Sequence, residues 1–174
     1  MKKGFTLVEL LVVIAILGIL MAMMVPATGI ILNRASKARA KADANVVVSV
    51  MMKYRAEYNR WPGFSTNNAA QHLTDAVWVD AMSPAPGTPM PPSNPKRIVF
   101  FEAGAGALAT NLPHAGAFVD SWGSPFEYQV DLDGNGEMGH PADDGQTFQA
   151  QVIAWSAGKD GDYKTWDDNV PSWE

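Results

Sequence analysis

Residues 131–137 have the oxygen-bearing side chains and the spacing of a cation-binding loop. The first, third and fifth positions are Asp131, Asp133 and Asn135, the sixth is Gly136, and Glu137 follows. The calcium loop of an EF-hand begins in this way, because calcium takes about six to eight oxygen ligands and the glycine permits a sharp turn. The match ends early, since position twelve, normally a glutamate, is Ala142. Asn-Gly is also a common turn between two strands, so a metal site and a plain hairpin loop both stay open.

The sequence offers little evidence for a catalytic site or for another kind of metal site. The chain has no cysteine, which excludes disulfides, thiolate metal sites and cysteine nucleophiles. The histidines His72, His114 and His140 lie far apart and lack the spacing of a zinc site. Neither a G-x-S-x-G nucleophile turn nor a phosphate-binding loop occurs. We therefore expect that the protein is not an enzyme.

Charge is distributed unevenly along the chain. Residues 33–119 carry nine Lys/Arg and five Asp/Glu, whereas residues 120–174 carry two Lys/Arg and twelve Asp/Glu. The acidic part would repel nucleic acid and attract a cation. With 174 residues, the chain has room for one modest domain and one membrane segment.

A membrane-spanning helix is predicted near the N-terminus. Residues 10–32 contain no charged side chain, and at about 1.5 Å per residue a helix of this length covers roughly 35 Å, enough to cross a bilayer core. The alternative is a secretory signal peptide with Lys2 and Lys3 as its basic region. The apolar core of a signal peptide is usually only about 7–15 residues long, so we predict an anchor.

Glu9 places an acidic side chain at the start of this apolar segment. An acid at the middle of a bilayer costs on the order of 2.5–3.5 kcal/mol and usually has a charged partner. If the chain were cut between Gly4 and Phe5, the new α-amine would lie one helical turn before Glu9, or would meet the Glu9 of a neighbouring subunit. Pro26 lacks an amide hydrogen and should kink or loosen the helix.

The residues around the possible cut resemble the processing signal of type IV prepilins and pseudopilins. They read Lys2-Lys3-Gly4-Phe5-Thr6-Leu7-Val8-Glu9-Leu10. The resemblance implies cleavage after Gly4 by a prepilin peptidase, N-methylation of Phe5, and a role for Glu9 in filament assembly. It also includes a proline at the position of Pro26, where subunit helices partly melt in a filament.

The rest of the pattern predicts an α+β protein. Apolar residues recur every three or four positions, which extends the helix to about fifty residues; they are Ala35, Ala38, Ala42, Val46, Val50, Tyr54 and Tyr58. Trp61 and Pro62 follow it and should end it. The remaining predicted elements are a short helix near residues 69–82, a stiff proline-rich loop over 83–95, a strand over 96–102, and an antiparallel pair formed by 126–130 and 148–154.

Two segments in the C-terminal third are similar to the major pseudopilin of type II secretion systems. Residues 120–128 (DSWGSPFEY) look like its turn and strand D-x-W-G-x-P-x-x-Y, and residues 153–161 (IAWSAGKDG) look like its last strand and the loop that follows. The resemblance implies the pilin fold, in which a long N-terminal helix with a transmembrane first half packs on a small antiparallel sheet that is followed by a C-terminal loop.

The same resemblance implies that the C-terminal loop binds calcium. The matching positions are the carbonyls of Trp155 and Val170 and the side chains of Ser156, Asp160, Asp167 and Asp168. Residues 162–166 replace a more glycine-rich run of the family, so the full ligand set stays open. Hard oxygen ligands from a closed loop suit calcium.

The expected organisation is a leader over residues 1–4, a transmembrane helix over 5–32 and a periplasmic part over 33–174. We expect a structural subunit of a periplasmic pseudopilus for type II protein secretion, with a single pass through the bacterial inner membrane. Expected partners are further copies of the chain in a helical filament, minor pseudopilins, the prepilin peptidase, and the secretion platform with its ATPase. The alternatives are a type IV pilus subunit and a membrane-tethered, calcium-ordered binding module or adhesin.

Overall fold

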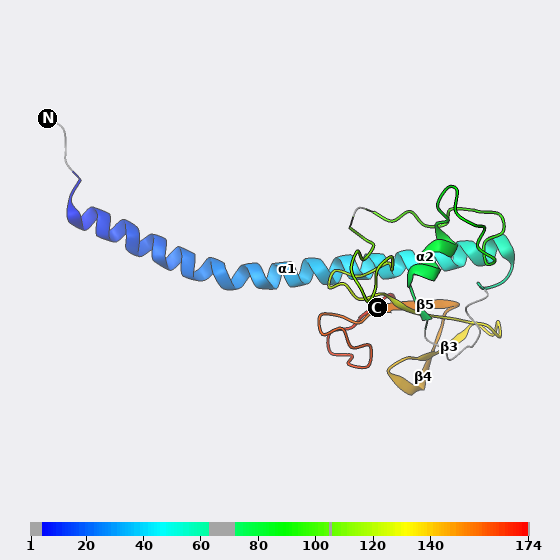
Figure 1. The fold of residues 1–174 in the computed structure, drawn as a ribbon. Coiled ribbons are helices and arrows are strands. Elements are labelled where there is room, and N and C mark those ends of the chain that lie inside the picture. Colours follow the sequence, from blue (N-terminus) through cyan, green and yellow to red (C-terminus); the bar gives the residue numbers. More distant parts are fainter. Residues whose placement is uncertain (1–4, 63–71, 105, 174) are drawn as a thin grey trace. The chain divides into compact units, whose positions relative to one another are not determined.

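A computed structural model describes residues 5–62, 72–104 and 106–173. The chain divides between Ser36 and Lys37 into two compact units. Helix α1, Leu7–Tyr58, contributes residues to both units (Figure 1). The other elements are β1 (His72–Leu73), α2 (Ala76–Met82), β2 (Glu127–Val130), β3 (Glu137–His140), β4 (Asp143–Gln149), β5 (Val152–Ser156) and β6 (Val170–Pro171).

The first unit contains the N-terminal part of α1, which begins at a reciprocal cap. The Glu9 carboxylate accepts hydrogen bonds from the Thr6 amide at 2.8 Å and the Thr6 hydroxyl at 2.7 Å, and that hydroxyl accepts one from the Glu9 amide at 3.2 Å. This arrangement is a capping box, which provides partners for groups that the first helical turn leaves unpaired. The helix therefore begins at Leu7, close to the predicted start at Phe5.

The apolar side chains that the structure describes in the first unit are exposed. Leu7, Ile19 and Leu32, for example, are 80%, 59% and 68% exposed. Within the described ranges, no helix is both long enough and apolar enough to cross a membrane. The membrane span over residues 5–32 stays a prediction, and the side chains of residues 23–27, including Pro26, lie outside the described part.

The second unit is built on the C-terminal part of α1. Ala40, Ala44, Val47, Met51 and Tyr54 recur every three or four residues and are completely buried. At 3.6 residues per turn, this spacing puts them in one stripe along the helix. Small side chains come first and larger ones follow, so the helix contacts the rest of the unit through a single apolar face. The sequence predicted a packed stripe here but placed its first part wrongly, since Ala35, Ala38, Ala42 and Val46 are exposed.

Helix α1 ends where the backbone becomes left-handed. Asn59 has a φ of 49°, and its amide donates to the Arg55 carbonyl at 2.8 Å. Asparagine tolerates this conformation better than most residues, which makes it a common helix terminator. The buried Trp61 follows, and its indole donates to the Asp131 carbonyl at 2.5 Å. The helix end is therefore tied to the sheet.

The main sheet has four antiparallel strands in the order β1-β2-β5-β6. In its central pair, Tyr128 lies opposite Ala154 and Val130 opposite Val152. The predicted pairing of residues 126–130 with 148–154 is correct for β5 and wrong for 148–149, because β4 ends at residue 149. Strands β3 and β4 form a separate two-stranded sheet.

The strand predicted over residues 96–102 does not form, although the structure describes this segment completely. Arg97 has a left-handed φ of 54°, which interrupts an extended strand. The amides of Phe100 and Phe101 both donate to the carbonyl of Met82, at 2.8 and 3.2 Å, instead of alternating along a partner strand. The segment crosses the end of α2 as an irregular connection.

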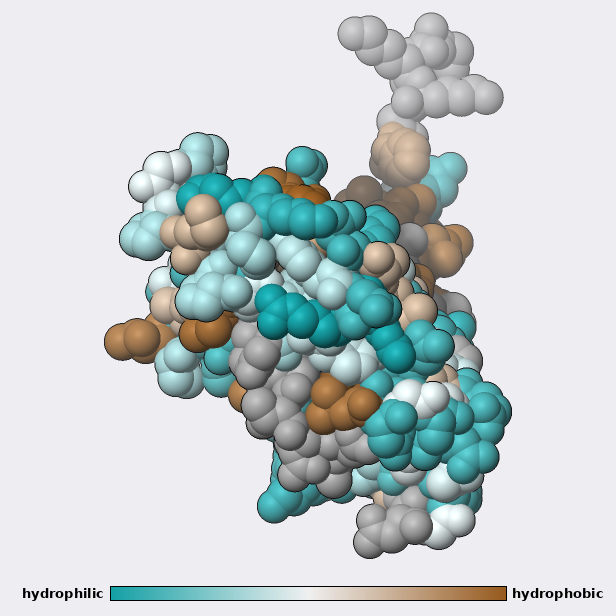
Figure 2. All heavy atoms as spheres, turned by 90° about the vertical axis from the view of Figure 1, so that its right-hand side faces the viewer, coloured by the Kyte–Doolittle hydropathy of each residue, from teal (hydrophilic) through white to brown (hydrophobic). Residues whose placement is uncertain are grey.

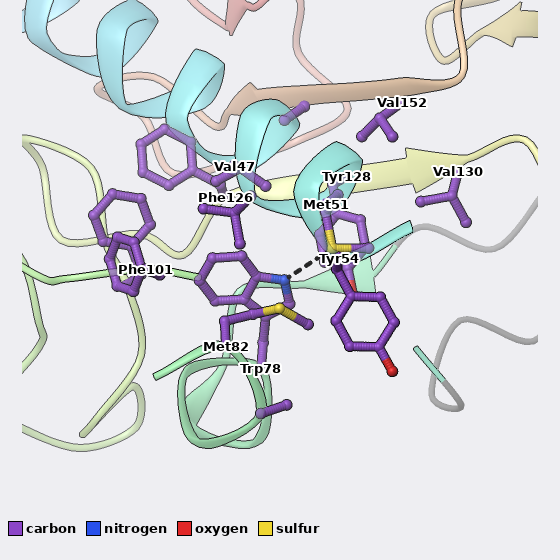
Figure 3. Close-up of a cluster of buried hydrophobic side chains, with 14 of the residues drawn as sticks. Val47, Met51, Tyr54, Trp78, Met82, Phe101, Phe126, Tyr128, Val130 and Val152 are labelled. Carbon is purple, nitrogen blue, oxygen red and sulfur yellow. Dashed lines mark hydrogen bonds between the residues drawn. The ribbon is translucent and has the colours of Figure 1, made fainter. Parts of the chain in front are cut away.

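Two apolar clusters cover the two faces of the main sheet. The larger one lies between α1, α2 and the sheet and contains Met51, Trp78 and Phe126; Figure 3 shows the Trp78 indole directed at the Met51 sulfur, 3.4 Å away. The smaller one contains Ile153 and Trp155, the residues that alternate with the first set along β5. The face of the second unit seen in Figure 2 is mainly hydrophilic, with separate apolar patches.

The proline-rich loop is fixed to the core by Asn94, which is completely buried. Its amide group donates to the carbonyls of Ala81 at 2.8 Å and Ile98 at 2.7 Å. Its side-chain oxygen accepts from the Tyr58 hydroxyl at 2.6 Å and the Ile98 amide at 3.1 Å. The stiffness of the loop stays a prediction, and Asn94 connects the loop to α1 and α2.

We expect Asn94→Ala to lower the free energy of unfolding of a chain that starts at Lys37 by about 2–4 kcal/mol, because it leaves several buried polar groups without partners. Urea unfolding followed by tryptophan fluorescence measures the change. Asn111→Ala, at an exposed position, is the matched control and should cost less than about 0.5 kcal/mol. Equal effects of the two substitutions would contradict the role given to Asn94.

Candidate functional site

The residues of the predicted processing signal lie at the start of α1. Phe5 is 74% exposed, and Glu9 is exposed as well. Gly4 lies outside the described residues. The Glu9 carboxylate contacts Thr6 in the capping box, so its assembly role stays a prediction. This part of the chain presents an exposed apolar helix with one carboxylate near its beginning.

The terminal loop, residues 157–169, connects β5 to β6 and is closed by Asp168. One oxygen of its carboxylate accepts hydrogen bonds from the amides of Lys159 at 2.7 Å and Asp160 at 3.3 Å. Gly158 lies directly against Asp168, since a Cβ there would come within 2.6 Å of the Asp168 carbonyl oxygen. Its φ of +72° also favours glycine. Both features bring the two ends of the loop together.

Asp160 organises the middle of the terminal loop. Its carboxylate accepts a hydrogen bond from the Thr165 hydroxyl and another from the Asp162 amide at 2.9 Å. The hydrogen bond from Thr165, followed by that from Asp162, lowers the pKa of Asp160 below its ordinary value. The carboxylate is therefore held ionised at the loop surface, where it can attract a cation.

Two oxygen atoms at the end of the terminal loop are buried without a hydrogen-bond partner. They are Oδ1 of Asp168 and Oδ1 of Asn169. The Asn169 amide nitrogen donates to the Tyr163 carbonyl at 3.0 Å, which fixes the orientation of the side chain. Buried polar atoms nearly always have partners, so the two oxygens fit a cation with oxygen ligands. The adjacency of Asn169 to Asp168 could have pointed to it, but sequence reasoning passed over it.

The other predicted calcium ligands lie in β5, in β6 and on the exposed surface of the terminal loop. Ser156 is completely buried, and its hydroxyl donates to Asp120 at 2.5 Å and accepts from the Gly158 amide at 3.0 Å. Trp155 lies in β5 and Val170 in β6, while Asp167 is exposed. Across the described ranges, no three His, Cys, Asp or Glu side chains are grouped so that they could hold a metal ion. A cation here would need amide and main-chain oxygens as well.

Two acids next to the loop, one buried and one partly buried, were not expected from the sequence. Asp120 is 6% exposed and accepts hydrogen bonds from the amides of Trp122 at 2.9 Å and Ser124 at 3.0 Å, yet burial raises its pKa. Glu127 faces Trp155 across the β2–β5 pair, and its Oε2 is buried without a hydrogen-bond partner. Burial raises the pKa of Glu127 to about 7, which the Trp155 side chain offsets only in part.

Tyr163 attaches the terminal loop to these acids. Its hydroxyl donates to the Pro125 carbonyl. Burial, together with the nearby charges of Glu127 and Asp120, raises its pKa well above the ordinary value of tyrosine. The phenol therefore stays protonated, and the loop is held against the sheet by a neutral hydrogen bond.

The second candidate loop, residues 131–137, has its oxygens occupied by its own chain. The Asp131 carboxylate accepts from the amides of Gly134 at 2.8 Å and Gly136 at 2.9 Å, and the Asn135 oxygen accepts from the Glu137 amide at 2.6 Å. Asp133 binds the side-chain amide of Asn135 at 3.1 Å. This geometry is that of a capped turn, which favours the hairpin alternative, and the cation alternative stays a prediction.

Charge and hydrogen bonding at Asp131 agree with that view. Burial alone would raise the pKa of Asp131, but interactions with Asp133, Gly136 and Gly134, and the positive charge of Arg55, outweigh it and lower the pKa. An ionised carboxylate that accepts two amide hydrogens is a stable turn cap without a metal.

Comparison with known proteins agrees with the N-terminal geometry. Residues 1–25 match the family described as "Prokaryotic N-terminal methylation motif". The chain is also 28% identical over 130 residues to "Type II secretion system core protein G" of Pseudomonas aeruginosa, covering 73% of this chain and 72% of that protein. It is 40% identical over 67 residues to "Fimbrial protein" of Neisseria meningitidis serogroup B. The chain is therefore similar, over different stretches, to type IV pilin and type II secretion proteins.

The similarity to pilins is confined to part of each chain. The match to "Fimbrial protein" covers 38% of this chain and 39% of that protein, and a match to "Type IV major pilin protein PilE1" of Neisseria gonorrhoeae is 39% identical over 67 residues. The chain thus matches about two fifths of the length of these pilins. No solved structure matches the chain. The long helix and antiparallel sheet confirm the predicted α+β pilin fold.

The partly buried Glu127 predicts a pH-dependent stability. The pKa of Glu127 in the folded protein, about 7, exceeds the ordinary value of 4.5. The protonated side chain therefore contributes to the free energy of unfolding fully below about pH 4.5, and this contribution is lost as pH rises through about 7. Between pH 5 and pH 8, the free energy of unfolding of the wild type should fall by about 1–2 kcal/mol relative to that of Glu127→Gln. This figure allows for solvent screening of a partly exposed group.

Urea unfolding of the Lys37–Glu174 unit at several pH values measures this difference. Glu102→Gln, at an exposed position, is the control and should follow the wild type. A Glu127→Gln curve parallel to the wild type from pH 5 to pH 8 would show that Glu127 has no raised pKa.

Proposed function

We propose that this protein is a structural subunit of a periplasmic pseudopilus that serves type II protein secretion. The observation that carries the proposal is the similarity to core protein G, which extends over 130 residues, whereas the similarity to the pilins covers 67. A match of that length reaches beyond the 52 residues of α1 and includes part of the second unit. A type IV pilus subunit is the second candidate, favoured by the higher identity to "Fimbrial protein".

In the proposed mechanism, the N-terminal segment anchors the chain in the bacterial inner membrane with the second unit in the periplasm. Prepilin peptidase removes residues 1–4, and Phe5 then carries a methylated α-amine. The carboxylate of Glu9, on the first turn of α1, offers that amine of a neighbouring copy an opposite charge in an apolar environment. Minor pseudopilins, the secretion platform and its ATPase complete the proposed set of partners.

We further propose that the terminal loop binds calcium. Asp160, Asp168 and the Asn169 side-chain oxygen would hold the ion, with Ser156, Asp167 and the carbonyls of Trp155 and Val170 as the remaining candidates. The two buried oxygens without partners and the ionised Asp160 support this choice. Bound calcium would supply two positive charges to the acidic part of the chain. The protein residues alone already close the loop, so the ion would strengthen an existing arrangement.

The filament function predicts a processed and assembly-dependent N-terminus. Intact mass spectrometry of membrane-extracted protein should give a mature chain that starts at Phe5 with one added methyl group. Glu9→Leu should keep the chain in the membrane and abolish or sharply reduce filaments in electron micrographs of sheared material, because it removes the carboxylate available to the amine. Glu57→Leu, in the second unit, is the control. Normal filaments from Glu9→Leu, or an uncut Met1, would refute the proposal.

The calcium site predicts a metal-dependent melting temperature. A ligand at about a hundredfold excess over Kd stabilises the folded state by about 2.7 kcal/mol, so the unit that starts at Lys37 should melt at least about 5 °C higher in calcium than in chelator. Asp160→Ala should remove most of this shift, and Asp133→Ala, in the hairpin loop, should keep it. Loss of the shift in Asp133→Ala alone would assign the ion to residues 131–137 instead.

A further inference from the structure

Basic residues follow the uncharged N-terminal segment of the chain without any acid among them. They are Arg34, Lys37, Arg39 and Lys41, and the nearest acids on either side are Glu9 and Asp43. Helix α1 continues through this stretch, so the bases stand on a helix and not on a loop. In membrane proteins, clusters of about four or more bases directly beside a spanning helix attract anionic lipids.

One of these bases is neutralised within the chain. The Nε of Arg39 lies 3.6 Å from the Asp43 carboxylate, and the Asp43 side chain is only 23% exposed. Arg34 is exposed, and Lys37 and Lys41 are half-buried. None of these three has an ion-pair partner among the residues that the structure describes. Their positive charges are therefore available to an anionic partner outside the chain.

The side chains of Lys37 and Lys41 are well placed for such a partner. The two residues are four positions apart, so they lie on one face of α1, beside the stripe that contains the completely buried Ala40 and Ala44. A half-buried lysine covers apolar surface with its methylene groups and keeps its ammonium group free. In an α-helix each Cα–Cβ bond tilts toward the N-terminus. Both lysine stems therefore leave α1 in the direction of the apolar segment.

The spacing of the bases fits the dimensions of a bilayer. Arg34, Lys37 and Lys41 follow Leu32 by two, five and nine residues. The headgroup layer on each side of the hydrocarbon core is about 5–7 Å deep, which a helix crosses in about three to five residues. With the membrane segment ending at Leu32, Arg34 falls within this layer and Lys37 at its edge. Lys41 reaches it through its long side chain, which extends toward the N-terminus.

In the proposed orientation these bases oppose insertion, so a compensating interaction is required. The positive-inside rule places an excess of Lys and Arg on the cytoplasmic side of a membrane helix. Here Lys2 and Lys3 precede the segment and four bases follow it. Removal of residues 1–4 would also take away the two cytoplasmic bases. Lipid phosphates offset this disadvantage, because they supply the opposite charge where the bases leave the bilayer core.

We propose that Arg34, Lys37 and Lys41 bind the headgroups of anionic phospholipids on the side of the membrane that holds the second unit. The contact belongs to the membrane-anchored subunit, before it enters a filament. A subunit that leaves the bilayer for a filament has to release these headgroups. This lipid contact rests on the membrane anchor of the proposed function, and it applies equally to a pseudopilus and to a pilus subunit.

The lipid selectivity of the full chain tests the contact. The chain is reconstituted in phosphatidylcholine vesicles, and electron paramagnetic resonance measures how strongly spin-labelled phosphatidylglycerol and spin-labelled phosphatidylcholine associate with it. We expect the anionic lipid to associate at least about threefold more strongly at low salt, because the three bases attract its phosphate. This preference should disappear in about 1 M salt, where the Debye length is only about 3 Å.

Substitutions assign the preference to the named bases. Arg34→Gln, Lys37→Gln and Lys41→Gln together should remove it. The matched control replaces three exposed bases of the second unit, Lys53→Gln, Arg60→Gln and Lys164→Gln. This control changes the net charge by the same amount and should keep the preference. Lys37→Arg with Lys41→Arg retains both charges and should keep it too, which separates loss of charge from a change in the fold.

The outcomes distinguish the contact from the function on which it rests. Equal association of the two lipids with the wild type overturns the contact. A preference that survives the triple substitution, or that is lost equally in the control, overturns it as well. A wild-type chain that alkaline carbonate washes off the vesicles overturns the membrane anchor and the contact together. A chain that keeps its lipid preference but forms no filaments in cells overturns the filament function and leaves the contact standing.

Discussion

Burial of one stripe of α1 is the constraint on which the second unit depends. Ala44, Val47 and Met51 are completely buried against α2 and the sheet. This cluster takes the side chains on one face of β2 and β5, so residues such as Ile153 and Trp155 must point away from the helix. These side chains are apolar too, and burying them requires a second cover. The β3–β4 hairpin and the terminal loop provide it, which explains why the acidic part of the chain folds over the sheet.

Sequence patterns predict the elements that local periodicity determines. They do not predict features that depend on contacts between distant residues. The spacing of small and apolar residues is sufficient to predict α1 to its last residue, Tyr58, and the β2–β5 pair follows from its flanking turns. The strand expected over residues 96–102 fails because Arg97 turns back to reach the loop at residues 85–88. Glu127 reads as an ordinary polar strand residue. Its long-range neighbours include Trp155 on β5 and Tyr163, 36 positions later, and no local pattern predicts them.

The two acidic loops differ in what their carboxylates do. In residues 131–137, the side-chain oxygens of Asp131 and Asn135 accept hydrogen bonds from nearby amides, so these oxygens have partners within the loop itself. In the terminal loop, Asp160 and Asp168 accept amide hydrogens as well, but two buried oxygens keep no partner. The spacing of residues 131–137 matches only the beginning of a known calcium motif, and the resemblance to pseudopilins already favoured the terminal loop. The distribution of unpaired oxygens supports that proposal, because a cation is favoured where buried acceptors outnumber donors.

The terminal loop is closed without any covalent link, in a chain that has no cysteine. Asp168 binds the amides that follow Gly158, Asn169 binds the Tyr163 carbonyl, and Tyr163 binds Pro125 outside the loop. Each such hydrogen bond contributes only about 1 kcal/mol net, and loops held by a few contacts open more readily than the core. Three attachments spaced along thirteen residues fix the loop at both ends and at its middle. Complete opening breaks all three, so a ligand that binds only the closed form stabilises the loop in addition to these contacts.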